Sequence, residues 1–460
     1  MDREKYDKRL TYRWQSDILK PPKTNIPGRE TKMKNRLVVM ILTAATVSSL
    51  MACGGGDGDA ASGGAEGTGV SITIFNSKSE VQGQFEEMAE EYSAKTGVNV
   101  EVYYSNDTVA AHLATRYSAN DPYTLAMVDA KDIYSLAEDY ASDLSDQEWV
   151  DKTDYEISVN DKVVGFPVCV EARGVIYNAD AIEAVTGETF VPEDYTTLDA
   201  FEGLLEKLAA GGMEAPAGIM KEDWSLAAHY LAETYEQQSD VEGFISDLYA
   251  GSADLAGNEK WNSMMDTFDV LMKYNYAASS PVAAEREVTE QKLAEGDIAF
   301  MFGGNWDWSV ISEYDYTENM GMMPVPQNTN DGTNGKLVGG GSKYFFIDSS
   351  DNTSEEQRQA AKDFLNWLVQ DGEGNQFLTE KCNLVPAYTN ISAAALDPLS
   401  VSVKKYADGN LLIDNYNYLP DDHLSVCGAF MQEYLAGKTD RTALAEKVAQ
   451  YWMAATPIEH

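Results

Sequence analysis

Short apolar runs alternate with amphipathic segments where the folded part of the chain begins, and this pattern constrains the fold more than any other feature. Strands are predicted at residues 70–75, 98–104 and 124–130. Between the first two, apolar residues recur at helical spacing up to Gly97, and a second helix is predicted from Asp107, a suitable N-cap residue. Strands that alternate with helices in this way predict a parallel sheet with helices on its faces.

The loops that follow the predicted strands are the first candidate binding positions. In open parallel sheets, ligands bind beyond the carboxyl ends of the strands. Residues 76–80, 105–107 and 129–132 occupy those positions. Polar residues also occur there in solvated loops and as helix caps, so a binding role and a purely structural role both stay open. The side chains of these loops that we predict to contact a ligand are Ser77, Lys78, Asp107 and Asp129.

The rest of the chain repeats the strand and helix pattern. Because 460 residues are too many for one core of ordinary size, two lobes are expected. Residues 163–185 hold two apolar runs with Glu171 and Arg173 between them, and Thr197 is predicted to cap a helix within 195–212. Further helices are predicted at 261–275, 289–296, 354–382 and 443–456, and further strands at 298–302 and after the glycines of 336–350.

The N-terminus predicts export and membrane attachment. Residues 33–52 combine basic residues with an apolar stretch that is too short to span a bilayer, as a signal peptide does. The sequence LMAC at 50–53 resembles a bacterial lipobox, in which the sulfur of Cys53 receives a diacylglycerol; an ordinary signal peptide with an incidental cysteine is the alternative. Residues 1–32 fit no export signal and look like an upstream extension, and the Gly-rich residues 53–69 predict a flexible tether.

Composition excludes several classes of function. A net charge of −41 at pH 7 argues against nucleic-acid binding, which needs a basic face. Only four histidines are present and none lies in an HExxH motif, so we expect no zinc site and no cofactor. The sequence also lacks GxSxG, Walker and GxGxxG motifs.

Three cysteines remain beyond the lipobox, so a fully paired disulfide framework is ruled out. One disulfide can still form, and Cys382–Cys427 is the better pairing. Cys169 lies in the apolar run FPVCVEA and is expected to be a small buried hydrophobic residue.

Three stretches together resemble the family 1 extracellular solute-binding proteins of sugar ABC importers, the group that includes maltose-binding protein. FPVCVEARGVIYNADAI at 166–182 resembles the first crossover of the family, although Ala179 stands where a lysine is usual. GDIAFMFGGNWDWS at 296–309 resembles its Gly-x-x-Ala-Met-x-x-x-Gly-x-Trp stretch. AKDFLNWLVQDGEGNQF at 361–377, followed by VPAY at 385–388, resembles its late helix and Pro turn.

The resemblance covers roughly residues 70–456 and implies both a fold and a function. The fold is α/β, a two-lobed periplasmic-binding-protein-like clamp of type II. The function is that of a substrate-binding lipoprotein, monomeric and not an enzyme, which captures a sugar between closing lobes at the extracytoplasmic face of the cell membrane and delivers it to an ABC permease. Three crossings between lobes are implied near 166–174, 335–342 and 382–388, with an N-terminal lobe of 70–168 plus 340–384 and a C-terminal lobe of 172–336 plus 387–458.

Trp306 and its neighbours offer the groups that carbohydrate recognition needs. A flat aromatic ring packs on the C–H face of a sugar, while carboxylates and amides bond its hydroxyl edge. By the resemblance, Trp306 falls on the stacking tryptophan of the family, next to Asn305 and Asp307 and after two glycines that permit a sharp turn. Core packing is the alternative for Trp306, and it is the expected role of Trp308 and Tyr177.

Other candidate site residues lie at the predicted crossings. By the resemblance, Glu171 matches a ligand-contacting glutamate, with a salt bridge to Arg173 as the alternative. Trp224 is a candidate second aromatic platform, and Gly340 and Gly341 either let the backbone approach the ligand or serve the hinge. The complete predicted set is Trp306, Glu171, Asp129, Asp307, Asn305, Trp224, Ser77, Lys78, Asp107, Gly340 and Gly341.

Two other classes of function fit part of the sequence. A membrane-tethered extracellular glycoside hydrolase also needs aromatic rings and paired carboxylates in a cleft, for which Glu171 and Asp307 are candidates. A binding protein for a polyamine would use carboxylates and cation–π contacts, and one for an acidic sugar would use basic side chains. The basic candidates are Lys78, Lys131, Arg173 and Lys343. The sequence leaves the sugar, its length, its anomer and the permease open.

Overall fold

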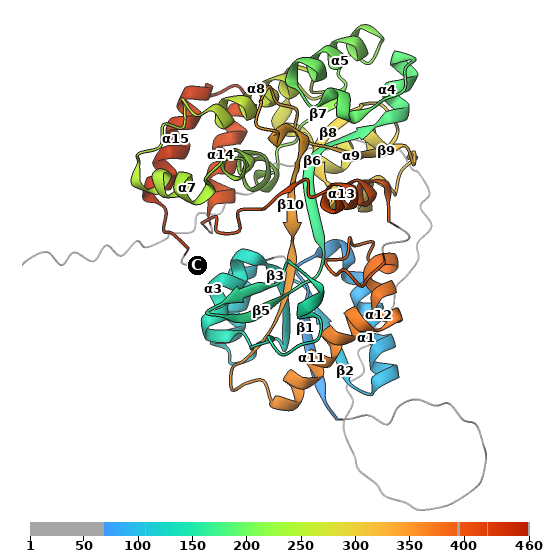
Figure 1. The fold of residues 1–460 in the computed structure, drawn as a ribbon, viewed down its shortest axis with the longest axis vertical. Helices are drawn as coiled ribbons and strands as arrows, with labels where there is room; N and C mark the ends of the chain where they lie inside the picture. Colours follow the sequence, from blue (N-terminus) through green and yellow to red (C-terminus); the bar gives the residue numbers. More distant parts are fainter. Residues whose placement is uncertain (1–68, 106, 393–395, 421, 459–460) are drawn as a thin grey trace, which may run out of the picture. The chain divides into compact units, whose positions relative to one another are not determined.

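A computed structural model describes residues 69–105, 107–392, 396–420 and 422–458. The predicted upstream extension, the signal peptide, the lipidation site at Cys53 and nearly all of the tether lie outside the described residues. Within the described residues the chain forms two six-stranded mixed sheets flanked by helices, which agrees with the α/β prediction (Figure 1).

The first sheet has the strand order β2-β1-β3-β11-β5-β4. Its first three strands are parallel, as the opening strand and helix alternation predicts. β11 runs antiparallel to both β3 and β5, which makes the sheet mixed. The bounds are β1 Ser71–Phe75, β2 Asn99–Tyr103, β3 Leu125–Asp129, β4 Ile157–Val159, β5 Lys162–Pro167 and β11 Lys343–Ile347.

Alternate residues of β3 face opposite sides of this sheet, as strand geometry requires. Leu125 and Met127 belong to one buried cluster, which includes residues of α1 (Gln82–Thr96) and α11 (Glu355–Gln370). Ala126 and Val128 belong to another, which includes Ile133 of α3 (Ala130–Tyr140). The sheet is therefore buried on both faces, which explains why β3 reads as a continuous apolar run.

The second sheet has the order β12-β10-β6-β8-β7, and β9 also pairs with β6. The long strand β6 pairs antiparallel with β10, β8 and β9, so it is the centre of this sheet. The bounds are β6 Val170–Asn178, β7 Ala217–Gly218, β8 Phe300–Gly304, β9 Met320–Met323, β10 Leu337–Gly341 and β12 Leu412–Ile413.

Two strand pairs carry the chain from one sheet to the other. β5 ends at Pro167 and β6 begins at Val170, whereas β10 ends at Gly341 and β11 begins at Lys343. Figure 1 shows β6 and β10 running side by side between the two sheets. These positions agree with the first two predicted crossings, while the predicted lobe boundaries stay a prediction.

The glycines of 336–350 precede the short strand β11, as predicted, and they also form the end of β10. A Cβ added at Gly339 would lie 2.5 Å from both the Cβ of Ala172 and the carbonyl oxygen of Glu171 on β6. Glycine therefore lets the two crossing strands approach closely.

Helix ends follow the expected capping chemistry at several sites. Thr197 accepts a hydrogen bond from the N–H of Ala200 and caps α5, and Ser354 does the same for Gln357 in α11. The prediction that Asp107 caps α2 was wrong, because Thr108 occupies that N-cap position. The other main helices are α2 Val109–Ser118, α4 Ala179–Thr186, α5 Leu198–Ala210, α7 Val241–Ala250, α8 Glu259–Lys273, α9 Arg286–Ala294, α13 Pro398–Asp408, α14 His423–Leu435 and α15 Arg441–Ala454.

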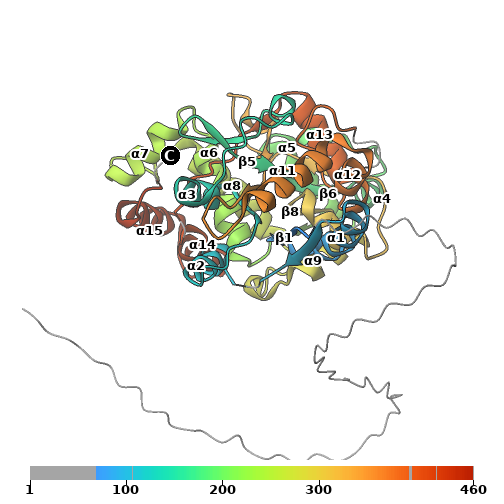
Figure 2. The same cartoon turned by 90° about the horizontal axis from the view of Figure 1, so that it is seen from below.

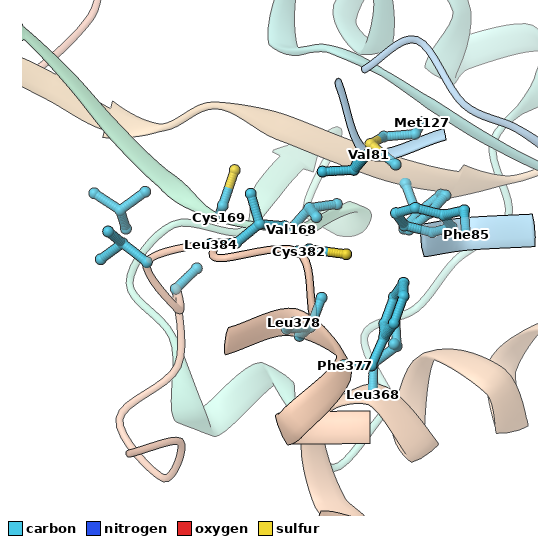
Figure 3. Close-up of a cluster of buried hydrophobic side chains, with 14 of the residues drawn as sticks. Val81, Phe85, Met127, Val168, Cys169, Leu368, Phe377, Leu378, Cys382 and Leu384 are labelled. Atoms are coloured by element: carbon cyan, nitrogen blue, oxygen red, sulfur yellow. The ribbon is translucent and has the colours of Figure 1, made fainter. Parts of the chain in front are cut away.

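The three described cysteines are buried free thiols, so the Cys382–Cys427 pairing that the sequence left open does not form. Figure 3 shows Cys169 and Cys382 in the apolar cluster that surrounds the crossing segments. Cys427 belongs to a different cluster, on α14, which lies beside α15 in both overall views (Figures 1 and 2). The two thiols of the predicted pair are thus buried in separate cores. Cys169 is the buried hydrophobic residue that the sequence predicts.

Phe345 tests the core of the first sheet. It lies on β11, is fully buried, and its ring centroid lies 6.1 Å from that of Phe85 and 6.4 Å from that of Phe364. Phe345→Ala should lower the free energy of unfolding by about 3–5 kcal/mol, because the truncation leaves a cavity. Urea denaturation followed by circular dichroism measures this loss. Val401→Ala, at a position that is 55% exposed, is the control and should change stability by less than about 0.5 kcal/mol. Equal effects of the two changes would contradict the assignment.

Candidate binding site

A cavity of about 790 Å³ is lined by residues from both sheets. The loops after β1 and β3 contribute from the first sheet, and β6 and the turn after β8 contribute from the second. The structure brings most of the predicted site residues together here, namely Ser77, Lys78, Asp129, Glu171, Trp224, Trp306, Asp307 and Gly341.

Three predicted residues are not among those that line the cavity. Asn305 is buried, and its Oδ1 accepts a hydrogen bond from the N–H of Ala172 at 3.1 Å, so its side chain holds the turn against β6. Asp107 is exposed beside α2, and its backbone N–H bonds to Ser105. Gly340 belongs to β10 but does not line the cavity.

Trp306 lies in a single 3-10 turn, Asn305–Asp307, directly after β8. Its ring is half-buried and lines the cavity. A Cβ added at Gly304 would come within 2.2 Å of the indole, so glycine provides the space in which the ring lies against the backbone. By contrast, Trp308 is only 8% exposed and packs edge-on against Tyr316, as predicted for a core residue. Tyr177 packs edge-on against Phe190, which agrees with its predicted role.

His229 joins the two candidate tryptophans into one aromatic wall. Its ring centroid lies 4.9 Å from that of Trp306 and 5.2 Å from that of Trp224. Trp224 and His229 belong to a π-helical segment, Trp224–Leu231. Because the π-helix repeats its hydrogen bonds at five-residue spacing, residues five apart lie on the same side. Sequence reasoning missed His229, since a lone histidine in an apolar helix gives no functional signal.

The aromatic wall is held by a buried ion pair. Arg286 bonds Asp307 through Nε and Nη2, both at 2.8 Å, and Asp307 also accepts from the N–H of Gly304 at 2.9 Å. The Arg286 guanidinium lies 4.5 Å from the centre of the Trp224 ring, which is cation–π geometry. Asp307 is 1% exposed, so its carboxylate fixes the turn that carries Trp306.

Glu171 is joined to the first sheet by an ion pair. The Nζ of Lys78 lies 2.6 Å from its carboxylate, and Ser342, between β10 and β11, donates a hydrogen bond to it. Glu171 thus forms its salt bridge with Lys78, and the alternative of a salt bridge to Arg173 is wrong. Burial would lower the pKa of Lys78, but Glu171 and Glu80 outweigh it and raise the pKa, so the ammonium stays charged.

The loop after β3 carries a similar arrangement. Lys343 lies 2.6 Å from Asp129, and Lys131 lies 2.7 Å from Asp132. Burial would raise the pKa of Asp129, but the Lys343 ammonium lowers it, so the carboxylate is ionised. Asp129 therefore faces the cavity as a charged acceptor that already has a protein partner.

Arg173 is enclosed by two glutamates behind the cavity wall. It bonds Glu236, its Nε lies 3.7 Å from Glu233, and its Nη1 donates to Asn415 at 2.7 Å. Burial raises the pKa of Glu233 to about 8 against the opposing effect of Arg173, so Glu233 is mostly protonated at neutral pH. Burial also lowers the pKa of His229 well below its usual value, with Arg173 and Arg286 adding to the effect, so this ring is neutral.

The cavity therefore suits an uncharged polar ligand with an apolar face. Each basic side chain that lines it has a carboxylate partner, as described above for Lys78, Lys131, Arg173, Arg286 and Lys343. Four polar atoms of the lining residues are buried without a hydrogen-bond partner among the described residues, and such atoms call for a ligand or water. They are Ser77 Oγ, Arg173 Nε, His229 Nδ1 and Trp306 Nε1.

The described part of the chain shows neither a metal cluster nor a membrane span. It holds no group of three or more His, Cys, Asp and Glu side chains suited to a metal ion. None of the helices in these residues is long and apolar enough to cross a bilayer.

Comparison with known proteins identifies the family. Residues 87–408 match the model of the bacterial extracellular solute-binding protein family, and the chain belongs to that family. No curated protein sequence matches.

Solved structures show the same fold. A chitin oligosaccharide binding protein superposes with a TM-score of 0.69 at 16% identity, covering 84% of this chain and 98% of that one. The solute-binding protein RafE in complex with raffinose gives 0.67 at 18% identity, over 84% and 99%. A sugar transporter protein from Bacillus licheniformis in complex with stachyose gives 0.63 at 21%, over 84% and 100%. The fold is thus the predicted two-lobed clamp of type II, in which the cavity lies between sheets of both lobes.

Glu233 makes the stability of the site depend on pH. In the folded chain the Glu233 carboxyl keeps its proton up to about pH 8, whereas in the unfolded chain it releases the proton near pH 4.5. The contribution of this carboxyl to the free energy of unfolding is therefore complete below about pH 4.5 and is lost as the pH rises through 8. Glu233→Gln cannot ionise. Between pH 5 and 8 the free energy of unfolding of the wild type should therefore fall relative to that of Glu233→Gln, by up to roughly 5 kcal/mol.

Urea denaturation of both proteins at several pH values measures this difference. Glu188→Gln, at a side chain that is 69% exposed, is the matched control and should show a constant difference from the wild type. A constant difference for Glu233→Gln as well would mean that the native carboxyl is already ionised.

Proposed function

We propose that this protein captures a neutral sugar or oligosaccharide between its two lobes and delivers it to the membrane permease of an ABC importer. The family binds extracellular solutes. The names of similar structures include a chitin oligosaccharide binding protein and complexes with raffinose and stachyose, which supports a carbohydrate ligand. In this proposal the chain acts as a monomeric binding protein without a cofactor.

The half-buried indole of Trp306 is the observation that carries the proposal. It lines the cavity next to His229, and its Nε1 has no hydrogen-bond partner among the described residues. A rigid ring packs on the apolar face of a pyranose at a low cost in conformational entropy. The polar side chains that line the cavity then supply hydrogen bonds to sugar hydroxyls.

Closure of the lobes follows from how the cavity is built. Its lining includes Lys78 and Asp129, which adjoin strands of the first sheet, and Trp224 and Trp306, which lie in a π-helical segment and a 3-10 turn of the other lobe. A ligand that contacts both sets binds the closed arrangement better than the open one, so it shifts the population toward closure. The closed form is then the form that docks on the permease.

The charge pattern favours a neutral sugar over the two charged alternatives. The basic side chains that an acidic sugar would need are already paired with carboxylates. A polyamine would need several free carboxylates, yet Glu171, Asp129 and Asp307 are paired with Lys78, Lys343 and Arg286. Glu287 also lines the cavity, and its carboxylate accepts a hydrogen bond from Tyr314. A charged ligand that displaced one of these ion pairs would leave the other member of the pair buried and unpaired, which is costly.

The hydrolase alternative lacks support from the same carboxylates. Glycoside hydrolysis needs one carboxyl that donates a proton and a second that attacks or activates water. Asp307 is 1% exposed and bonded twice to Arg286, and Glu171 is held by Lys78 and Ser342. Incubation with oligosaccharides separates the two functions, because release of shorter products would contradict a pure binding role.

Trp306→Ala tests the proposal directly. Raffinose, stachyose and a chitin oligosaccharide are titrated into the full chain by calorimetry and by thermal shift. The wild type should bind at least one of them and gain melting temperature, since a ligand that binds only the native state stabilises it. The variant should lose about tenfold to 100-fold in affinity, because one to a few kcal/mol of stacking and burial disappear.

The melting temperature of the ligand-free variants is the control for folding. Trp306→Ala should lower it only slightly, because the ring is half-buried at the cavity. Trp308→Ala should lower it strongly, because that ring is buried in the core. A wild type that binds none of the sugars, or a Trp306→Ala variant that binds them normally, would contradict the proposed function.

The membrane anchor has a separate test, because residue 53 lies outside the described residues. We propose that Cys53 carries a lipid and that the Gly-rich segment after it tethers the binding domain to the membrane. Cys53→Ser should move the protein from the membrane fraction to the soluble fraction of a bacterial host and abolish labelling by radioactive palmitate. Sugar affinity should stay unchanged. Palmitate labelling of the variant would refute lipidation at this position.

A further inference from the structure

The segment Asn415-Tyr416-Asn417-Tyr418, between β12 and α14, also lines the cavity, although the sequence analysis assigned it no role. Asn415, Tyr416 and Asn417 all contribute to the cavity lining, as does Leu419. The segment has neither helical nor strand structure, so its backbone depends on tertiary contacts for its position.

Two contacts attach the start of this segment to the charge cluster of Arg173. The Oδ1 of Asn415 accepts a hydrogen bond from Arg173 at 2.7 Å, and the N–H of Tyr416 donates to Glu236 at 2.9 Å. Tyr416 is 8% exposed and belongs to the buried cluster of the second lobe. Because Arg173 and Glu236 are themselves buried, the segment has a rigid base.

A third contact joins the end of the segment to the other lobe. The ring centroid of Tyr418 lies 4.6 Å from that of Tyr134, which belongs to α3 beside the first sheet. The Tyr416 ring lies 5.5 Å from Tyr418 and supports it edge-on. The segment is therefore attached to one lobe at residues 415 and 416 and packs on the other lobe at residue 418.

Asn417 lies between these attachments. Its side chain is half-buried, lines the cavity, and makes none of the hydrogen bonds found among the described residues. An amide presents two donors and one acceptor, which matches the hydroxyl edge of a sugar. Its neighbours are fixed, so little conformational entropy is lost when this amide binds a ligand.

We propose that residues 415–418 form a second ligand-binding wall, in which the Asn417 amide bonds ligand hydroxyls and the Tyr418–Tyr134 contact joins the lobes around the bound molecule. This inference rests on the proposed capture of a sugar. It assigns hydroxyl recognition to a segment distant in sequence from the Trp306 turn, and it makes the fit of a ligand depend on both walls.

Asn417→Ala in the full chain tests the inference, with Asn352→Ala as the matched control. Asn352 is exposed in a turn before α11 and does not line the cavity. Raffinose, stachyose and a chitin oligosaccharide are titrated into the wild type and both variants. For the sugar that the wild type binds, Asn417→Ala should weaken affinity about threefold to tenfold, as expected for one or two lost hydrogen bonds, and Asn352→Ala should not.

Tyr418→Ala tests the contact between the lobes, which is independent of the hydrogen bonds of Asn417. With the sugar saturating, small-angle scattering should give a larger radius of gyration for this variant than for the wild type, because a contact between the lobes is lost. The inference would be overturned if the wild type binds sugar normally while Asn417→Ala keeps its affinity and Tyr418→Ala keeps its radius of gyration. That result would leave the proposed function standing. Failure of the wild type to bind any sugar would instead overturn the proposed function.

Discussion

The antiparallel pairing of β6 with β10 is the constraint on which the rest of the structure depends. Both strands belong to the second sheet. A few residues connect β6 to the preceding β5 and β10 to the following β11, and β5 and β11 belong to the first sheet. The pairing is close because Gly339 leaves room for the backbone of Glu171 and Ala172. Two paired strands with short connections allow the lobes to rotate relative to each other while their sheets stay intact, which is the geometry of hinge closure.

Ion pairs determine what the cavity between the sheets can accept. Lys78 bonds Glu171, Lys343 bonds Asp129, and Arg286 bonds Asp307, so the charges of the lining are largely satisfied before any ligand arrives. Burial of an unpaired charge is expensive, whereas a paired and hydrogen-bonded charge can be buried. The cavity can therefore combine a low-dielectric aromatic wall with a polar lining and still favour an uncharged ligand.

The positions of the aromatic and amide groups come from local backbone features rather than from long regular elements. Trp306 follows a strand by a single turn, and His229 lies beside Trp224 because a π-helical segment places residues five apart on one side. Asn417 lies in a segment without regular structure, and Arg173 and Glu236 form hydrogen bonds with the two residues before it. Such groups are held in place because their neighbours are buried and bonded.

The sequence by itself determined the strand and helix alternation, the helix capped by Thr197 and the aromatic turn at Trp306, because periodicity, capping and glycine turns are local properties. The partners of Glu171 and Asp307 and the free state of Cys382 were decided only by the tertiary structure. Lys78 is 93 positions from Glu171, and residue 417 lies 111 positions after Trp306. The packing of two sheets, which no local pattern encodes, brings such distant groups into one cavity.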